Sequence, residues 1–171
     1  MVIATVEPVP EPQSLKGGDG SAVQAASVEV DYSMECAPIG ATVKRALRLA
    51  NIEQRLVLGL SEAVSALAKT PEEYLFCFMA AGDSATHHMH EVLLQAFCFE
   101  HDIYIIKVDS AEKLSRLLGT TGCHQSCALI QKSWSPDHQT EILSKVEDQL
   151  VDYCEEHWED PVKPVIKLPE K

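Results

Sequence analysis

The chain has 171 residues, of which 46% are hydrophobic, and this is enough for one packed domain but too few for two of ordinary size. Its formal net charge of −12 and isoelectric point near 4.9 argue against binding nucleic acid or an anionic membrane surface, because such binding needs a face rich in lysine and arginine. An acidic chain is better suited to meet basic surfaces on other proteins.

Residues 1–37 contain scattered proline, glycine and serine and few aromatic side chains. Such a segment buries too little apolar area to offset its ordering entropy, so we expect it to be disordered and to precede a single domain over 38–171. The sequence shows neither a secretory signal nor an apolar stretch long enough to span a bilayer. We therefore expect a protein of the nucleus and cytoplasm whose six cysteines remain thiols.

Helices and strands are predicted to alternate along the rest of the chain, from apolar residues at helical spacing and from short apolar runs. The run YLFCFMAA at 74–81 is typical of a strand covered on both faces. This alternation predicts an α/β domain with helix layers on both sides of a sheet. The predicted elements are helix 41–55, strand 56–60, helix 61–68, strand 74–81, helix 87–101, strand 103–108, helix 110–119, strand 126–132, helix 140–158 and strand 164–168.

Several predicted helix ends carry recognisable capping residues. Ser61, Ser84 or Thr86, and Ser110 stand where an N-cap side chain is needed, and Gly119 follows the fourth helix as a stop. The last helix is expected to bury a stripe of five residues, namely Ile142, Val146, Leu150, Tyr153 and Cys154.

The segment HHMHEVLLQAFCFEHD, residues 87–102, contains four histidines, a cysteine and three acids. Leu94 and Cys98 lie well away from the side expected to face the sheet, yet both are apolar. Because this apolar arc is wider than one sheet contact requires, we expect a second polypeptide to cover the surplus. Four residues make up the side expected to face the sheet, namely Val92, Leu93, Ala96 and Phe97.

The histidines of this segment do not form a good metal site, because Leu94 interrupts the arc shared by His87, His90 and His101, and third and fourth ligands are missing. The CHQSC stretch at 123–127 likewise lacks a second ligand pair for structural zinc. We expect no metal and no cofactor. Histidines at such a position could also tune a contact surface with pH, and the sequence leaves their role open.

Catalysis is also not expected. Cys98 would need a neighbouring histidine and an oxyanion pocket, and cysteines inside helices between aromatic residues are usually inert packing. The GxGxxG, GxxxxGK[ST], GxSxG and HExxH motifs do not occur.

Charged residues allow two interpretations, a solvated face or a docking surface. The main basic cluster, Lys44, Arg45 and Arg48, falls on the outer face of the first helix. The acids of the C-terminal third would either face solvent or dock to a basic partner. These acids are Glu141, Glu147, Asp148, Asp152, Glu155, Glu156, Glu159 and Asp160.

Four segments carry a family resemblance, namely LLQAFCFEHDI at 93–103, KLSRLL at 113–118, SCALIQ at 126–131 and PVIKLPE at 164–170. By these segments, of which the first and last are specific, the chain from about residue 41 to its end resembles the growth-arrest and DNA-damage-inducible (GADD) stress-sensor family in order and spacing. Length and acidity fit an invertebrate member. The resemblance implies a three-layer α/β/α sandwich with a mixed sheet, similar to the ribosomal kink-turn-binding proteins.

RNA-binding proteins of this fold carry an asparagine–glutamate–lysine signature after the first strand. Here GLSEAVS keeps Glu62 but has Ser61 and Ser65 in place of asparagine and lysine. RNA binding is therefore the alternative function, disfavoured by these substitutions and by the net charge.

The resemblance implies a non-enzymatic stress-response adaptor that binds and activates a MAP kinase kinase kinase, feeding JNK-type MAP kinase signalling and regulating the cell cycle and growth arrest. It also implies contacts with a cyclin-dependent kinase, its inhibitor and the replication sliding clamp. Family members form homodimers through the helix that matches residues 87–101. On this chain, that role falls on Leu93, Leu94, Gln95, Phe97 and Cys98.

The resemblance further makes Glu100, Asp102 and Asp83 candidate partner contacts. Vertebrate members have a heavily acidic loop after the second strand, whereas AAGDSATHH here has one acid, Asp83, and the later acidic insert is shortened to GTTGCHQ. The kinase-kinase-kinase role is better supported than the cyclin-dependent-kinase contact, because it does not depend on that loop alone.

Overall fold

The computed structural model describes residues 38–82, 84–120 and 122–170 of the chain. The predicted disorder of 1–37 lies outside these residues, so it stays a prediction, as do the domain boundaries drawn from it.

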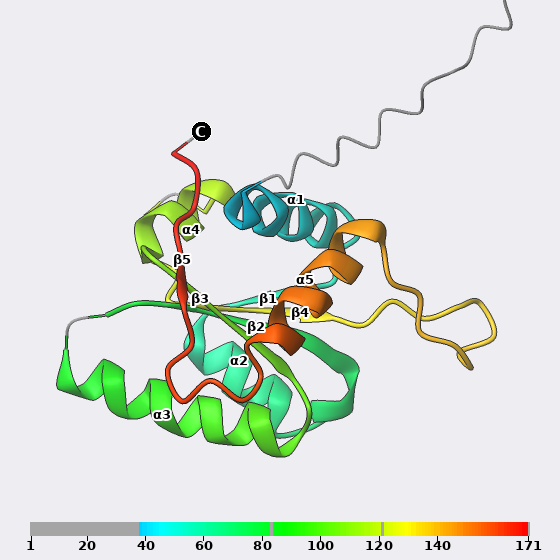
Figure 1. Ribbon diagram of the computed structural model, residues 1–171, viewed down its shortest axis with the longest axis horizontal. Helices are drawn as coiled ribbons and strands as arrows, with labels where there is room; N and C mark the ends of the chain where they lie inside the picture. The colour runs from blue at the N-terminus through cyan, green and yellow to red at the C-terminus, as the bar shows by residue number, and fades with distance from the viewer. Residues whose placement is uncertain (1–37, 83, 121, 171) are drawn as a thin grey trace, which may run out of the picture. The chain divides into compact units, whose positions relative to one another are not determined.

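A mixed five-stranded sheet forms the middle of the fold (Figure 1). Its strands are β1 (Leu56–Leu58), β2 (Tyr74–Ala80), β3 (Tyr104–Val108), β4 (Cys127–Gln131) and β5 (Val165–Ile166). They lie in the order β1-β4-β2-β3-β5. β4 pairs antiparallel with β1 and β2, while β3 pairs parallel with β2 and β5, so β4 alone among these five runs against the others.

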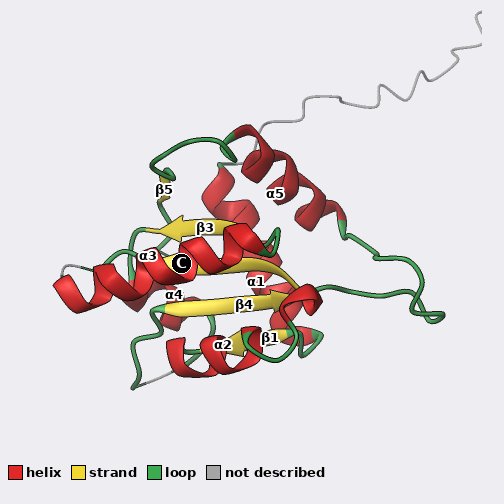
Figure 2. Cartoon of the chain, turned by 90° about the horizontal axis from the view of Figure 1, so that it is seen from below, coloured by secondary structure: helices red, strands yellow, loops and turns green. Residues whose placement is uncertain are grey.

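Helices cover both faces of this sheet (Figures 1 and 2). They are α1 (Ile39–Ile52), α2 (Leu60–Leu67), α3 (Ala85–Glu100), α4 (Ala111–Leu117) and α5 (Lys145–Glu156), with a short 3₁₀ helix at Pro71–Glu73. α1, α4 and α5 lie on one face, and α2 and α3 lie on the other. The predicted α/β fold with three α/β/α layers is therefore confirmed.

β2 is the centre of both cores, since all seven of its residues are buried. Phe76 and Phe78 point into the core beneath α1, α4 and α5. Cys77 and Met79 point into the second core beneath α2 and α3. The prediction of a strand covered on both faces is confirmed, and the continuous apolar run reflects this two-sided burial.

The helix caps are mostly those that the sequence predicted. The Ser84 hydroxyl accepts a hydrogen bond from the backbone N–H of His87, and Ser110 caps α4 in the same way. Gly119, with φ of +71°, ends α4 in the left-handed conformation that glycine adopts without strain. Ser61 is not a cap, because α2 begins one residue earlier and its N-cap position is Gly59.

α5 begins five residues later than predicted. Ser144 and Glu147 form a reciprocal capping box that fixes the helix start, and the preceding loop leaves Ile142 exposed instead of in the inner stripe. The position of Glu147 shows that the C-terminal acids do not all lie on a solvated face. Its side chain is 1% exposed and forms an ion pair of 2.9 Å with Arg55, which joins the turn between α1 and β1 to the start of α5.

The predicted orientation of α3 is wrong. Leu94 and Cys98, expected on the outer side, are 6% and 0% exposed and lie in the core of α2 and α3. Leu93 and Val92, expected against the sheet, are 63% and 48% exposed, and Ala96 is exposed as well.

The reversal has a physical cause in a polar residue on the inner arc of α3. Glu91 lies half-buried there because its carboxylate is paired with Lys107 on β3 at 2.7 Å. A hydropathy pattern places glutamate outward, whereas a paired carboxylate can lie beside the sheet. The helix is therefore turned so that Leu94 and Cys98 fill the core.

The two adjacent leucines of α3 provide a direct test of its orientation. Leu94→Ala should lower the free energy of unfolding by about 2–4 kcal/mol, because it leaves a cavity in the core. Leu93→Ala is the matched control and should cost about 0.5 kcal/mol or less. Urea denaturation followed by circular dichroism measures both, and equal losses would contradict the orientation.

Candidate protein-binding surfaces

An apolar groove of about 570 Å³ lies between α2 and α3 on the outer side of their helix layer. Val64 on α2 and Leu93 on α3 are exposed large apolar side chains that face this groove. Met89 and Val92 extend the exposed apolar surface along α3. The groove is lined by Leu60, Ser61, Val64, Ser65, Leu67, Ala68, His90, Leu93, Leu94 and Phe97.

The five predicted self-association residues lie at different depths in this helix. Leu93 is exposed at the groove, and Phe97 is half-buried along it. Leu94 lines the groove but belongs to the core, and Gln95 is half-buried and hydrogen-bonded to the side chain one turn earlier. Cys98 is sealed in the core, so it cannot touch a partner of the folded protein.

The α2 half of the groove was not predicted from the sequence. Ser61, Val64 and Ser65 supply it, and Val64 is exposed between small residues. The signal was present in SEAVSALA, where a branched apolar side chain stands on a helix face otherwise made of serine and alanine. Ser61 and Ser65 also replace the polar signature expected of RNA-binding proteins, and both line an apolar hollow.

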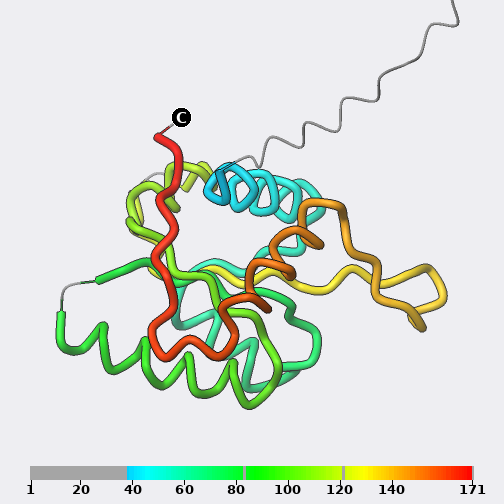
Figure 3. The backbone as a smooth tube through the Cα atoms, viewed as in Figure 1, coloured from blue at the N-terminus to red at the C-terminus, as the bar shows by residue number. Residues whose placement is uncertain are grey.

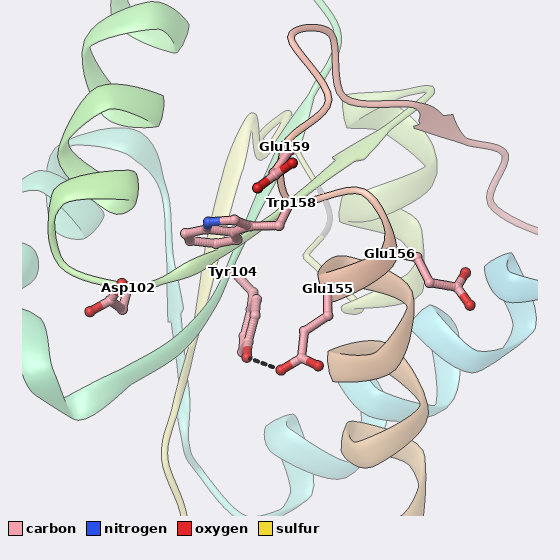
Figure 4. Close-up of a pocket in the computed structure, with 6 residues that line it drawn as sticks. All are labelled: Asp102, Tyr104, Glu155, Glu156, Trp158 and Glu159. Carbon is pink, nitrogen blue, oxygen red and sulfur yellow. Dashed lines mark hydrogen bonds between the residues drawn. The ribbon is translucent and has the colours of Figure 1, made fainter.

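A second hollow, of about 560 Å³, has a different chemical character (Figure 4). It lies where the end of α3, β3 and the end of α5 meet, because the chain after α5 turns back toward α3 (Figure 3). We call it the acidic cleft. It is lined by Asp102, Tyr104, Glu155, Glu156, Trp158 and Glu159.

Trp158 is held in the acidic cleft by contacts with three side chains. Its indole stacks on the Phe99 ring of α3 at 5.1 Å between centroids, and the Tyr104 ring meets it edge-on at 5.8 Å. The Lys163 ammonium lies 5.7 Å from the indole centroid, at the distance of a cation–π contact. The aromatic wall of the cleft is therefore formed before any partner arrives.

The carboxylates of the acidic cleft accept few contacts from the rest of the described chain, and the Lys163 ammonium at the Trp158 wall is not in an ion pair with them. The Tyr104 hydroxyl donates a hydrogen bond of 3.0 Å to Glu155. Burial of the phenol, together with this hydrogen bond to a carboxylate, raises the pKa of Tyr104 to about 12. Within 38–82, 84–120 and 122–170, no ion pair engages the four acids that line the cleft.

The structure places only one of the three predicted partner contacts in the acidic cleft. Asp102 lines the acidic cleft in a left-handed conformation with φ of 55°, which aspartate tolerates better than most residues. Glu100 is exposed at the end of α3, outside the lining of the cleft. Asp83 lies outside the described residues.

Four of the described cysteines are buried free thiols, namely Cys77, Cys98, Cys127 and Cys154. Hydrogen bonds with Cys127 and Cys98, together with burial, raise the pKa of the Cys77 thiol and keep it protonated. No three histidine, cysteine or acidic side chains in the described part of the chain are grouped so as to hold a metal ion. Among the helices that the structure describes, none has the length and apolarity to cross a membrane.

Fold and sequence comparison together define the class of the protein. The layered fold is that of a ribosomal-protein-like α/β/α domain, here with one apolar and one acidic hollow on its surface. The chain belongs to the ribosomal protein L7Ae/L30e/S12e/Gadd45 family, whose model matches residues 41–138. The resemblance to the GADD proteins predicted from the sequence is thereby confirmed.

Three relatives place the chain within this family. It is 28% identical to growth arrest and DNA damage-inducible protein GADD45 alpha of Homo sapiens over 151 residues, covering 78% of this chain and 89% of that protein. It is 28% identical to GADD45 beta of Bos taurus over 134 residues, covering 69% and 79% of the two chains. With GADD45 gamma of Bos taurus the identity is 37% over 70 residues, covering 38% and 43%.

Titration of Tyr104 tests the geometry of the acidic cleft. Its raised pKa means that the folded state binds the phenolic proton more tightly than the unfolded state does. The resulting stabilisation is present below pH 10 and should be lost as the pH rises from 10 toward 12.

Tyrosinate absorbance, taken as the difference between wild type and Tyr104→Phe, measures this pKa. Glu155→Gln should bring it down toward 10, because the amide removes the negative charge beside the phenol. An unchanged pKa in Glu155→Gln would show that the carboxylate does not contribute.

Proposed function

We propose that this protein is a non-enzymatic stress-response adaptor that binds and activates a MAP kinase kinase kinase, and thereby promotes JNK-type signalling and growth arrest. Relatives named for growth arrest and induction by DNA damage support the general role. The observation that carries a binding mechanism is the apolar groove between α2 and α3. An adaptor of this kind acts by occupying surfaces and needs no chemistry of its own.

The groove has the properties of a protein-binding surface. Leu93 and Val64 are exposed on its two sides, and Met89 and Val92 continue the apolar surface beyond it. Contiguous exposed apolar area of this kind is costly in water and commonly marks a site that a partner covers. We assign the groove to a second copy of the chain, in agreement with the homodimer that the GADD resemblance implies.

Kinase activation would follow from a population shift. The adaptor binds the open form of the kinase more tightly than its autoinhibited form, and it shifts the equilibrium by that difference in affinity. A homodimer presents two adaptor surfaces at once, which raises the effective concentration at the second contact. Self-association through the groove would therefore increase the activation that each adaptor produces.

The remaining partners follow from the same resemblance. We propose action in the nucleus and cytoplasm, with a cyclin-dependent kinase, its inhibitor and the replication sliding clamp as further partners. The net charge of −12 favours proteins over nucleic acid as binding partners. Ser61 and Ser65 likewise favour a protein partner over RNA, because they replace the asparagine and lysine of the RNA-binding signature and line the groove.

Leu93→Glu tests the self-association step, with Ile52→Glu as the control. Both leucine and isoleucine are exposed in the monomer, but Ile52 lies at the end of α1, away from the groove. Light scattering should find a dimer for wild type and Ile52→Glu. Leu93→Glu should be a folded monomer, since a buried unpaired carboxylate weakens the dimer by about tenfold or more.

Kinase activation is then measured with the same three proteins. Activation of the co-expressed kinase should fall in Leu93→Glu and persist in Ile52→Glu. A dimeric Leu93→Glu would reject the groove as the interface, whereas a monomer that still activates fully would remove the dimer from the mechanism. Absence of binding between the wild-type protein and the kinase would overturn the proposed function itself.

A further inference from the structure

The acidic cleft is a separate surface from the groove, since the two hollows share no lining residue. We propose that it binds a basic peptide segment of a protein partner, with an arginine side chain seated against Tyr104 and Trp158 and paired with the surrounding carboxylates. The inference rests on the proposed adaptor function for its biological setting. The cleft itself can be tested without any kinase.

The first support is the preformed shape of the cleft. Phe99 and Lys163 hold Trp158. The hydrogen bond to Glu155 holds Tyr104 (Figure 4). A side chain entering this hollow meets aromatic surfaces that are already in place. Binding then costs little ordering of the protein, which is the usual gain from preorganisation.

The second support is charge complementarity. Three acids elsewhere in the described chain, Glu91, Asp109 and Glu147, form ion pairs near the sheet or a helix end. The acids of the cleft have no such partner among residues 38–82, 84–120 and 122–170. Their mutual repulsion is relieved when a cation enters, so the cleft selects positively charged ligands.

Arginine fits this chemistry better than lysine does. The guanidinium is flat, so it can stack along an aromatic ring while its five N–H groups donate to carboxylates on more than one side. The acceptors surround the aromatic residues, with Asp102 after α3 on one side, Glu155 in the last turn of α5 on the other, and Glu159, after α5, above the indole (Figure 4). A lysine ammonium could pair with one carboxylate but would not stack in the same way.

Two other ligand classes fit less well. The cleft carboxylates are not grouped for metal binding, since the described residues contain no cluster of three suitable ligands. Nucleic acid would be repelled by the same acids. A peptide is the ligand class that remains. A hollow of about 560 Å³ is large enough for a long side chain and part of its backbone.

Fluorescence anisotropy with the full chain and a labelled peptide of alternating arginine and glycine tests the proposal. Asp102→Asn/Glu159→Gln should weaken binding by about tenfold or more, which corresponds to the loss of charge-assisted hydrogen bonds. The control is Glu72→Gln/Asp137→Asn, which makes the same change in charge at exposed positions outside the cleft. It should leave the affinity within about twofold, the size of a remote screened charge effect.

A second measurement locates the peptide. The sequence contains two tryptophans, so Trp134→Phe leaves Trp158 as the one emitter. Its fluorescence should change on addition of the arginine peptide and remain constant with a glutamate–glycine peptide. A lysine–glycine peptide should bind several-fold more weakly than the arginine peptide.

Several results would overturn the inference. These are no binding of the arginine peptide at low salt, equal losses in the cleft and control variants, or equal affinity for the lysine peptide. A change of molecular mass in Asp102→Asn/Glu159→Gln would assign the cleft to a second copy instead. Leu93→Glu should bind the peptide normally, because Leu93 does not line the cleft. Loss of peptide binding and loss of kinase activation are therefore separate results, and each rejects a different proposal.

Discussion

Burial of β2 on both faces is the constraint on which the rest of the structure depends. Phe76 and Phe78 require cover on one side of the sheet, and Cys77 and Met79 require it on the other. Each Å² of apolar surface left in water would cost about 25 cal/mol, so neither face can remain open. α1, α4 and α5 cover the first face, while α2 and α3 cover the second.

This constraint also decides which surfaces remain for partners. Leu94 and Cys98 of α3 pack in the core, and in this orientation of the helix Leu93 points outward into the groove that Val64 also lines. The same helix ends at the acidic cleft, where Phe99 supports Trp158. One helix therefore contributes to an apolar groove on its outer side and to an acidic, aromatic cleft at its end, and the two hollows suit partners of different chemistry.

The sequence predicted the features that depend on local signals. The two-sided burial of β2 was visible in a continuous apolar run, and the Ser84 and Ser110 caps precede their helices directly. The face of α3 was not predicted correctly, because both of its arcs are apolar and the pairing that turns Glu91 inward comes from Lys107 on another element. The acidic cleft could not be predicted as a unit, since packing alone brings together its segments near 102 and 158.

The central claim is that the outward face of α3 and the neighbouring α2 are available to another polypeptide. Amide hydrogen exchange at low and high protein concentration tests it most directly, because association slows exchange in the elements that it covers. The account predicts slower exchange in α2 and α3 at high concentration, with β2 strongly protected at both. Exchange in α2 and α3 that is independent of concentration, or slowing confined to α1 and α4, would contradict it.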